Sequence, residues 1–222
     1  MEVSVVIPNF NGIAFLDSVL ASLEGQTLNN FEVILVDNGS TDGSCSFVTA
    51  NYPWVHLIEL SENFGFCGAV NAGIRAAKAP YVLLLNNDTE VKEDFVEEML
   101  AAIRRHKNAF SCGARMVQYH DRDKLDDVGN YYCALGWSFA RGRGKDIHAY
   151  ETEDRIFSAC AGAAIYRKKI LEKIGYFDEE HFAYLEDTDI GYRARIYGYE
   201  NWYAPKAIVY HVGLSLIHIS EP

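Results

Sequence analysis

The sequence lacks any apolar run near the roughly 18 residues that a membrane span needs, and it lacks cysteine pairs. Its five cysteines are scattered, with no C-x-x-C motif. An odd number of isolated cysteines is a poor disulfide framework, so reduced thiols are expected. No basic flank or cleavage signal precedes the first apolar run at Val3. These absences predict a cytoplasmic protein, and they leave contact with the inner face of the membrane open.

Positive charge is also scarce. The chain has 20 Lys and Arg against 31 Asp and Glu, a formal net charge of −11. This balance argues against nonspecific nucleic-acid binding through the whole surface, and no nucleic-acid partner is expected. One short basic segment, residues 141–145, could meet phosphates, although such a segment is typically a solvated turn. The 222 residues fit one domain with a full core.

Two common phosphate-binding motifs are missing. No G-x-G-x-x-G follows the first predicted strand, where residues 8–12 read P-N-F-N-G, and no Walker lysine follows any strand. A dinucleotide-binding fold and a P-loop nucleotidase are therefore disfavoured. A pyrophosphate held here would need a divalent cation, Mg²⁺ or Mn²⁺, with carboxylate ligands. Asp88 is the natural ligand, and a turn-forming or N-cap role is the alternative for it.

Apolar runs rich in β-forming residues alternate with helical patterns through the first half. Strands are predicted at 3–7, 31–36, 55–60 and 81–85, and helices at 14–23, 45–51, 68–77 and 95–105. Strands that read as continuous apolar runs are typical of parallel sheets covered on both faces. The sequence thus predicts an α/β fold with a Rossmann-like, mostly parallel central sheet. Ligands of such sheets bind beyond the carboxyl ends of the strands, here loops 8–11, 37–42, 61–66 and 86–88.

The second half is less regular. Residues 119–153 are rich in Gly, Asp, Arg and Tyr and are interpreted as a variable segment. Order returns over 156–166, followed by a helix near 168–174 and a closing strand at 207–210. Within 182–193, three carboxylates stand inside an apolar stretch: Glu186, Asp187 and Asp189. A helix N-terminus with an Asp189–Arg193 pair would explain two of them. Because Asp37 and Asp88 also end apolar runs, a shared cleft is the other interpretation.

Eight short motifs then occur in one order. They are V-V-I-P-N-F-N at 5–11, V-D-N-G-S-T-D at 36–42, N-x-G-F-x-G-x-x-N-x-G at 63–73, L-N-N-D at 85–88, G-A-A-I-Y-R at 162–167, G-Y-F-D at 175–178, E-D-x-D at 186–189 and V-Y-H at 209–211. In this order the chain resembles the inverting family 2 glycosyltransferases of GT-A fold, particularly their rhamnosyltransferase-like branch. Each motif alone is weak, and their shared order carries the resemblance.

The resemblance implies one GT-A domain over residues 1–213. Residues 1–110 would form the nucleotide-binding half, and residues 111–213 the acceptor and catalytic half. The variable segment 119–153 would then face the acceptor. The last residues, 214–222, are apolar and short and depart from the family pattern, so they are interpreted as a truncated or foreign tail, with a genuine short terminal strand as the alternative.

The resemblance also assigns roles to single residues. Asp37 would hold the nucleotide base, and its neighbours would be Pro8, Asn9 and Phe10. The other substrate-binding assignments are Asn63, Asn71 and Gly162, which stand within the motifs.

The same resemblance assigns the metal and the chemistry. The family's D-x-D motif appears here as N-N-D at 86–88, so Asp88 alone inherits the metal role. His211 would approach the metal or the pyrophosphate, and a strand-end surface histidine is the alternative. Asp187 would be the general base and would start ionised without a raised pKa. Glu186 would orient the helix or reach an acceptor hydroxyl.

The implied function is metal-dependent, inverting transfer of a sugar from a dTDP- or UDP-sugar to a saccharide or lipid-linked acceptor, in cell-surface polysaccharide synthesis. Mn²⁺ or Mg²⁺ would be the cofactor. A sugar nucleotidyltransferase is one alternative, but it would need a Gly-rich loop with Arg or Lys after the first strand. A noncatalytic nucleotide-sugar-binding module is the other, and the intact Asp187 argues against it.

Overall fold

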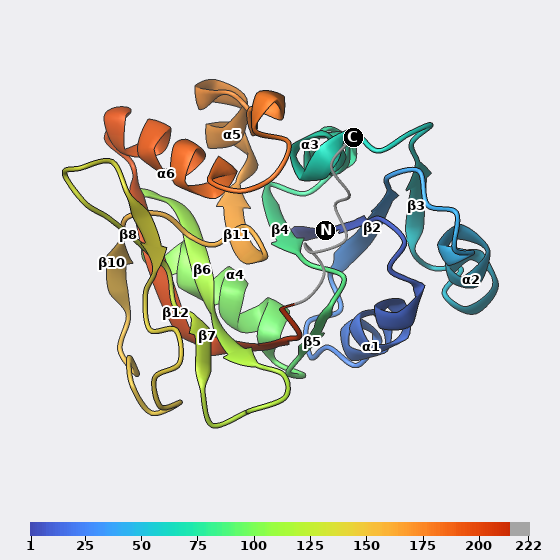
Figure 1. Cartoon of the computed structure of the whole chain (residues 1–222), viewed down its shortest axis with the longest axis horizontal. Helices are drawn as coiled ribbons and strands as arrows, with labels where there is room; N and C mark the ends of the chain where they lie inside the picture. Colours follow the sequence, from blue (N-terminus) through green and yellow to red (C-terminus); the bar gives the residue numbers. More distant parts are fainter. Residues whose placement is uncertain (214–222) are drawn as a thin grey trace.

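The computed structural model describes residues 1–213, which form one large mixed sheet with helices on both faces (Figure 1). The predicted atypical tail, 214–222, lies outside the described residues. The strand order is β10-β12-β6-β11-β4-β1-β2-β3, with β5 paired to β12 and β7 paired to β6. Strand β4 of the first half pairs with β11 of the second in this same sheet. The division near residue 110 stays a prediction.

The first half contains the predicted strands and helices. Its parallel strands are β1 (Val3–Asn9), β2 (Phe31–Asp37), β3 (His56–Glu59) and β4 (Tyr81–Leu85). The centres of β1, β2 and β4 are buried, which is why these strands are continuously apolar. Because these strands are parallel, their carboxyl ends meet at one edge of the sheet, as predicted.

Helices cover the two faces separately (Figure 1). One face packs against α1 (Ile13–Glu24), α2 (Ser44–Asn51) and α4 (Phe95–Arg105). The other face packs against α3 (Gly65–Ala76), α5 (Lys168–Ile174) and α6 (Glu186–Ile196), and the short 3₁₀ helix η1 (Glu179–His181) precedes α6. No helix within residues 1–213 combines the length and the apolar character that crossing a bilayer requires.

Helix α4 shows how the sequence dictates this packing. Its buried residues Phe95, Met99 and Ile103 are spaced by four, so they form one stripe against the sheet. Acidic residues stand in its first turn and basic residues in its last, which suits the helix dipole. The same period predicted this helix at 95–105, and the structure confirms it.

The second half is more elaborate than the prediction. It contains β6 (Ala109–Gln118), β7 (Leu125–Asp127), β8 (Asn130–Tyr132), β9 (Ser138–Ala140), β10 (Asp154–Ile156), β11 (Ala163–Arg167) and β12 (Glu200–His211). The short strand β5 (Thr89–Val91) belongs to the first half and pairs with β12. The ordered stretch expected at 156–166 is two separate strands, β10 and β11. The closing strand predicted at 207–210 is only the end of β12, whose register shifts between Ala204 and Ile208, around Pro205.

Strand β11 departs from the parallel expectation. It runs antiparallel to both β4 and β6, because the chain returns through the sheet after the long segment that follows β6. The backbone N–H of Asn86, after β4, donates to the carbonyl of Gly162, before β11, at 2.8 Å. This bond places the loop before β11 beside the carboxyl ends of the parallel strands.

Candidate active site

Asparagine side chains hold the predicted crevice loops together. Asn9, at the end of β1, donates from Nδ2 to Ser40 Oγ at 3.3 Å and accepts from Asn87 Nδ2 at 2.8 Å. Asn38, in the loop after β2, donates from Nδ2 to Oδ1 of Asn63, in the loop after β3, at 2.8 Å. The loops after β1, β2, β3 and β4 therefore lie at one edge, as predicted, and short amides fix their relative positions.

Close backbone approach explains one glycine of these loops. Gly39 has a φ of +81°, and a Cβ atom there would lie 2.9 Å from the backbone of Glu62. Any larger residue would push the loops after β2 and β3 apart. The V-D-N-G-S-T-D motif thus owes its glycine to the assembly of the crevice.

Asp37 is almost fully buried at the end of β2. Its carboxylate accepts the backbone N–H of Ser40 at 3.1 Å, which is the turn-forming arrangement. Asn71 is also buried and uses its amide on the segment before α6: Nδ2 donates to the Phe177 carbonyl at 2.8 Å and to Glu179 Oε1 at 2.9 Å. The substrate-binding roles of Asp37, Asn63 and Asn71, and those of Pro8, Asn9 and Phe10, stay predictions.

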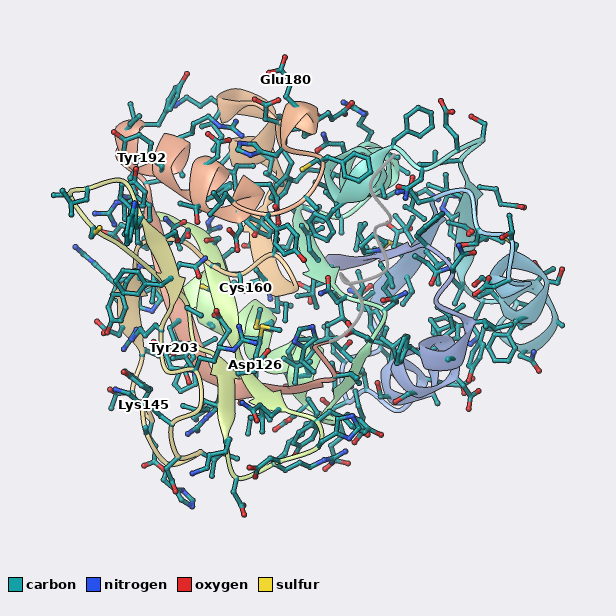
Figure 2. The ribbon with its side chains drawn as sticks, in the orientation of Figure 1. Asp126, Lys145, Cys160, Glu180, Tyr192 and Tyr203 are labelled. Atoms are coloured by element: carbon teal, nitrogen blue, oxygen red, sulfur yellow. The ribbon has the colours of Figure 1, made fainter. Side chains whose placement is uncertain are left out.

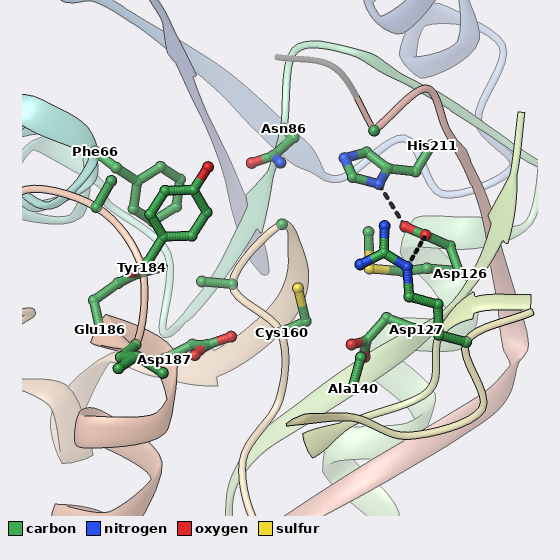
Figure 3. A pocket seen from close by; sticks show the side chains of 17 residues that line it. Phe66, Asn86, Asp126, Asp127, Ala140, Cys160, Tyr184, Glu186, Asp187 and His211 are labelled. Atoms are coloured by element: carbon green, nitrogen blue, oxygen red, sulfur yellow. Dashed lines mark hydrogen bonds and ion pairs between the residues drawn. The ribbon is translucent and has the colours of Figure 1, made fainter. Parts of the chain in front are cut away.

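A cavity of about 370 Å³ opens between the two halves (Figure 3). Its lining includes Asn86 from the first half and Gly162, Glu186, Asp187 and His211 from the second. Figure 3 shows Glu186 and Asp187 on one side of this cavity, with His211 and Asp126 on the other. Asp37 does not line it, and Asp189 pairs with Arg193 at 2.7 Å, which confirms the predicted helical pair. Of the acids in the shared-cleft interpretation, Asp187 lines this cavity, and a common cleft with Asp37 and Asp88 stays a prediction.

The backbone before α6 is strained where it enters the site. Phe182, Tyr184 and Leu185 have φ values of 54°, 70° and 64°, in a region that residues other than glycine rarely adopt. The carbonyl of Phe182 accepts the backbone N–H of Phe66 at 2.7 Å, so contact with α3 holds part of this conformation. Strain of this kind persists at sites whose surroundings over-determine it, and here it aims the start of α6 at the cavity.

Glu186 and Asp187 begin α6 in the cavity wall, where Glu186 is buried and Asp187 is half-buried. Burial raises the pKa of Glu186 to about 7, and the neighbouring charge of Asp187 adds to this shift. Glu186 Oε2 has no hydrogen-bond partner among the described residues. A buried carboxyl oxygen without a partner is costly unless the group is protonated or meets a ligand.

Asp187 has partners that fix its carboxylate. Asn130 Nδ2 donates to Asp187 Oδ2 at 3.1 Å, and Thr188 Oγ1 donates to Asp187 Oδ1 at 3.3 Å. Burial raises the pKa of Asp187, while these hydrogen bonds counteract the rise. The structure thus corrects the expectation of an unshifted carboxyl, because the sequence did not show how deeply α6 starts inside the fold.

On the opposite wall, His211 contacts two aspartates from distant segments of the sequence. His211 Nε2 lies 3.4 Å from Asp88 Oδ1, and His211 Nδ1 lies 2.7 Å from Asp126 Oδ2. Burial alone would lower the pKa of His211, but the hydrogen bonds to Asp126 and Asp88 raise it to about 9. Asp88 also accepts the backbone N–H of Gly213 at 3.1 Å. The two residues assigned to the metal therefore meet, although they are 123 positions apart.

These two side chains fit a divalent cation. A carboxylate oxygen and an imidazole nitrogen 3.4 Å apart suit two positions in one shell, and oxygen-rich shells suit Mg²⁺ or Mn²⁺. Histidine binds a metal in its neutral form, so a cation would replace the proton that Asp88 and Asp126 favour. Within residues 1–213, no group of three or more His, Cys, Asp or Glu is placed to hold a metal ion. A cation at Asp88 and His211 would take its other ligands from substrate oxygens.

Three residues of the site were not predicted from the sequence. Asn130, Asp126 and Asp127 lie within the segment interpreted as variable, yet Asn130 bonds Asp187, and both aspartates line the cavity. Asp127 is buried, which raises its pKa well above the ordinary value. The D-D-V-G-N run at 126–130 was the available signal, because such a polar cluster rarely stands without a turn or a site.

The fold and the site define a class. A parallel β/α half that ends in polar loops, joined through one sheet to a half with buried carboxylates, is the architecture of the GT-A nucleotide-sugar transferases. A family model described as "Glycosyl transferase family 2" matches residues 4–175, and the chain belongs to that family.

Two named relatives extend this result. The chain is 27% identical to the N-acetylglucosaminyl-diphospho-decaprenol L-rhamnosyltransferase of Mycobacterium tuberculosis, over 93% of this chain and 75% of that protein. The rhamnosyltransferase-like resemblance is thereby confirmed. A second relative, the putative teichuronic acid biosynthesis glycosyltransferase TuaG of Bacillus subtilis, is 30% identical over 56% of this chain and 50% of its own length.

Solved structures confirm the GT-A fold. Staphylococcus aureus TarS 1-349 in complex with UDP superposes with a TM-score of 0.69 at 22% identity, covering 95% of this chain and 60% of that one. GalNAc-T7 with UDP, GalNAc and Mn²⁺ superposes with a TM-score of 0.79 at 15% identity, covering 95% and 44%. The chain thus spans about half the length of these solved chains.

Proposed function

We propose that this protein transfers a sugar, with inversion, from a nucleotide-diphosphate donor to a saccharide or lipid-linked acceptor in cell-surface polysaccharide synthesis. The observation that carries the proposal is the arrangement across one cavity. Asp187 stands on one wall and His211 on the other (Figure 3). Asp88 Oδ1 lies 3.4 Å from His211 Nε2. Inverting transfer needs a base and a leaving-group stabiliser on opposite sides of the reacting carbon, and these groups satisfy that need.

The carboxylate of Asp187 carries the proton transfer. The acceptor hydroxyl oxygen attacks the anomeric carbon, its proton passes to Asp187, and the bond from that carbon to the diphosphate oxygen breaks with its electrons on oxygen. Asn130 keeps Asp187 Oδ2 in place, and Asp187 Oδ1 faces its own partner in Thr188. A raised pKa suits a general base, because its proton affinity lies nearer to neutral pH.

The residues on the opposite wall stabilise the negative charge of the leaving group. Asp88 and His211 are the residues that would hold Mn²⁺ or Mg²⁺, and such a cation supplies charge neutralisation for the departing diphosphate. Asp126 orients the His211 ring through its Nδ1 atom. Asn86 lines the cavity in place of the first carboxylate of the family's metal motif, so the protein contributes one carboxylate to the shell.

The relatives support a class of donor. TarS 1-349 and GalNAc-T7 are both described with UDP, and a relative is named as an L-rhamnosyltransferase. We therefore propose a UDP- or dTDP-sugar as donor, with the rhamnosyl donor as the first to test. The lipid-linked acceptor named for the mycobacterial relative supports a diphospholipid-linked saccharide as acceptor here.

Donor hydrolysis with Mn²⁺ across a panel of UDP- and dTDP-sugars tests the proposal, because it needs no acceptor. Slow release of the free sugar from one donor class is expected. Release of inorganic pyrophosphate from a sugar phosphate and a nucleoside triphosphate would instead identify a nucleotidyltransferase. Donor binding without turnover, even with lipid-linked and polysaccharide acceptors added, would identify a noncatalytic module.

A further inference from the structure

Residues 141–145 are the basic segment for which a phosphate contact and a solvated turn were both considered. This segment follows the β8–β9 hairpin, and its backbone is bonded to β7 and the turn after it. The backbone N–H of Arg141 donates to the carbonyl of Gly129 at 2.8 Å, and that of Gly144 donates to the carbonyl of Leu125 at 2.8 Å. The segment is therefore held in place, and the fold sets where each of its cations lies.

Two of the three cations have partners away from the active-site cavity. Arg141 is buried and pairs with Asp154 at 2.9 Å, and its guanidinium lies 4.5 Å from the centre of the Tyr150 ring. Lys145 Nζ donates to Tyr150 Oη at 3.0 Å. In Figure 2, Lys145 lies toward the outer edge of the molecule, whereas Asp126 lies nearer its centre. These two cations therefore stabilise the segment itself.

The third cation, Arg143, lines the active-site cavity together with His211. Its Nε atom lies 3.9 Å from Asp126 Oδ1, and His211 Nδ1 lies 2.7 Å from Asp126 Oδ2. One carboxylate therefore places the guanidinium and the imidazole on the same wall. The Arg143 side chain is 72% exposed, and Asp126 is its one ionic partner within residues 1–213. Because a loose, exposed ion pair contributes little, the guanidinium can exchange Asp126 for a ligand at little cost.

Gly142 explains why two arginines so close in the sequence have different surroundings. Alternate residues of an extended chain point to the same side, but Gly142 has a φ of +81°, which turns the backbone between Arg141 and Arg143. A Cβ atom at Gly142 would lie 2.7 Å from Val128 Cγ2. This glycine thus allows one arginine to be buried and the next to line the cavity.

We propose that Arg143 binds the diphosphate of the nucleotide-sugar donor. This inference rests on the proposed function, in which Asp187 accepts the proton on the opposite wall and the departing diphosphate lies on the wall of His211. A planar guanidinium offers several N–H donors that match phosphate oxygens. No Walker lysine follows any strand, so Arg143 supplies a permanent positive charge that does not depend on a bound cation.

A lipid-linked acceptor also carries phosphates, so the two sources of this chemistry must be separated. In inverting transfer the acceptor hydroxyl attacks from the face of the sugar opposite the diphosphate, which is the side of Asp187. Arg143 belongs to the other wall, through its contact with Asp126. The geometry therefore favours the phosphates of the donor, and binding measured without acceptor distinguishes the two.

Titration of the whole protein with UDP and dTDP tests the assignment, by calorimetry with Mn²⁺ and by NMR in EDTA. Arg143→Ala should weaken binding about tenfold in both conditions, the lower end of what a hydrogen bond to a charged group contributes. Arg143→Lys should recover part of the affinity, because it keeps the charge and loses the planar fork. Uridine has no phosphate and should bind to wild type and to Arg143→Ala alike.

Lys145→Ala is the matched control, because it removes a cation of the same segment that contacts Tyr150. Equal affinity of wild type and Arg143→Ala for UDP and dTDP would overturn the assignment alone. Unchanged affinity with a raised KM for a diphospholipid-linked saccharide would assign Arg143 to the acceptor. An equal loss of uridine binding would show that Arg143 only supports the fold of the site. A wild type that binds neither UDP nor dTDP would overturn the proposed donor, and this inference with it.

Discussion

The acids of the two halves of the molecule differ in their surroundings. In the first half, Asp37 and Asp42 end a strand and a turn, and both accept backbone N–H groups. Partial burial alone would raise the pKa of Asp42, but hydrogen bonds from Ser44 and from the amide of Ile13 hold it below its ordinary value. In the second half, Glu186 is buried and Asp187 half-buried, and desolvation raises the pKa of both.

This difference separates binding from proton transfer. A carboxylate surrounded by N–H groups stays charged at all physiological pH values, which suits a fixed hydrogen-bonding position in a binding loop. A buried carboxyl with a raised pKa exchanges a proton near neutral pH, which suits a general base. We therefore expect the two halves of the crevice to serve different tasks, and variants in each half should fail in different ways.

The largest effect is expected for Asp187, the proposed general base in the second half. Asp187→Asn should leave folding and donor binding nearly intact and reduce sugar transfer by about 10²–10⁴-fold, the usual contribution of general-base catalysis. The amide is nearly isosteric but cannot accept the proton. Steady-state transfer assays measure this loss. Asp189→Asn is the control, because Asp189 pairs with Arg193, and full activity of the Asp187 variant beside a dead, folded Asp189 variant would reverse the assignment.

Removal of divalent cations tests the junction of the halves, where Asp88 meets His211. Donor affinity should fall by on the order of a hundredfold in EDTA, since a cation contributes several kcal/mol at a diphosphate. Calorimetry with UDP and dTDP, with and without Mn²⁺, provides the measurement. Equal affinity in both conditions would refute the metal assignment and leave His211, protonated, as the positive group.

Glu186 should make the stability of the fold depend on pH. Its pKa is about 7 in the folded state against 4.5 ordinarily, so the folded protein binds more protons between these values. Stability should therefore fall as pH rises from 4.5 to 7, by about 3 kcal/mol in all. Glu186→Gln should remove this loss, so that the variant is more stable than wild type at about pH 8 and similar to it below about pH 4.

Denaturant unfolding across this pH range measures the effect. Glu180→Gln is a suitable control, because Glu180 is exposed in η1. If the wild type has the same free energy of unfolding at the acid and the alkaline end of this range, the ionisation of Glu186 does not destabilise the fold. The difference between the acids of the two halves would then rest on the raised pKa of Asp187 alone.

In the first half, Asp37→Ala should weaken donor binding and leave metal dependence unchanged. Loss of one hydrogen bond to a charged group costs roughly 1.5–3 kcal/mol, and the predicted bond goes to the nucleotide base. Titration with UDP and dTDP measures the affinity. If the variant binds the donor normally but unfolds early, then the bond to the Ser40 amide is the whole role of Asp37.

The sequence predicted the first half better than the second for a physical reason. Strands β1, β2 and β4 are continuous buried apolar runs followed by turn residues, so a local window identifies each of them whatever its partner in the sheet. Strand β6 pairs with β12, about 90 residues further along the chain. Nothing in a local window reports such a partner, and β12 was recognised only at its apolar end.

The same reasoning applies to the site. Asp37, Asp88 and Asp187 follow recognisable runs and motifs, so the sequence could nominate them. Asp126 and Asn130 could not be nominated, because they depend on contacts with His211 and Asp187 that the fold brings from 85 and 57 positions away. Burial, which sets the pKa of Glu186 and Asp187, is likewise a property of the assembled sheet.

Asn130 tests the difference between the acids of the two halves, and its expected effect is the smallest. Its amide donates to Asp187 Oδ2 at 3.1 Å and to Ser158 Oγ at 3.1 Å, so it orients the carboxylate and favours its charged form. Asn130→Ala should lower kcat about tenfold, the loss expected from one hydrogen bond, with the donor KM unchanged. Asn108→Ala, which removes an amide bonded to the Gly198 carbonyl, is the matched control.

The pH profile decides whether Asn130 acts on the base or only on the fold. Without the Asn130 amide the pKa of Asp187 rises further, because burial is then opposed by fewer hydrogen bonds. Transfer requires the ionised carboxylate, so the acid limb of the kcat profile should move to higher pH in Asn130→Ala and stay fixed in Asn108→Ala. A lower kcat with an unmoved limb would assign Asn130 to the support of the β8–β9 hairpin, since a purely structural loss leaves the proton affinity of Asp187 as it was.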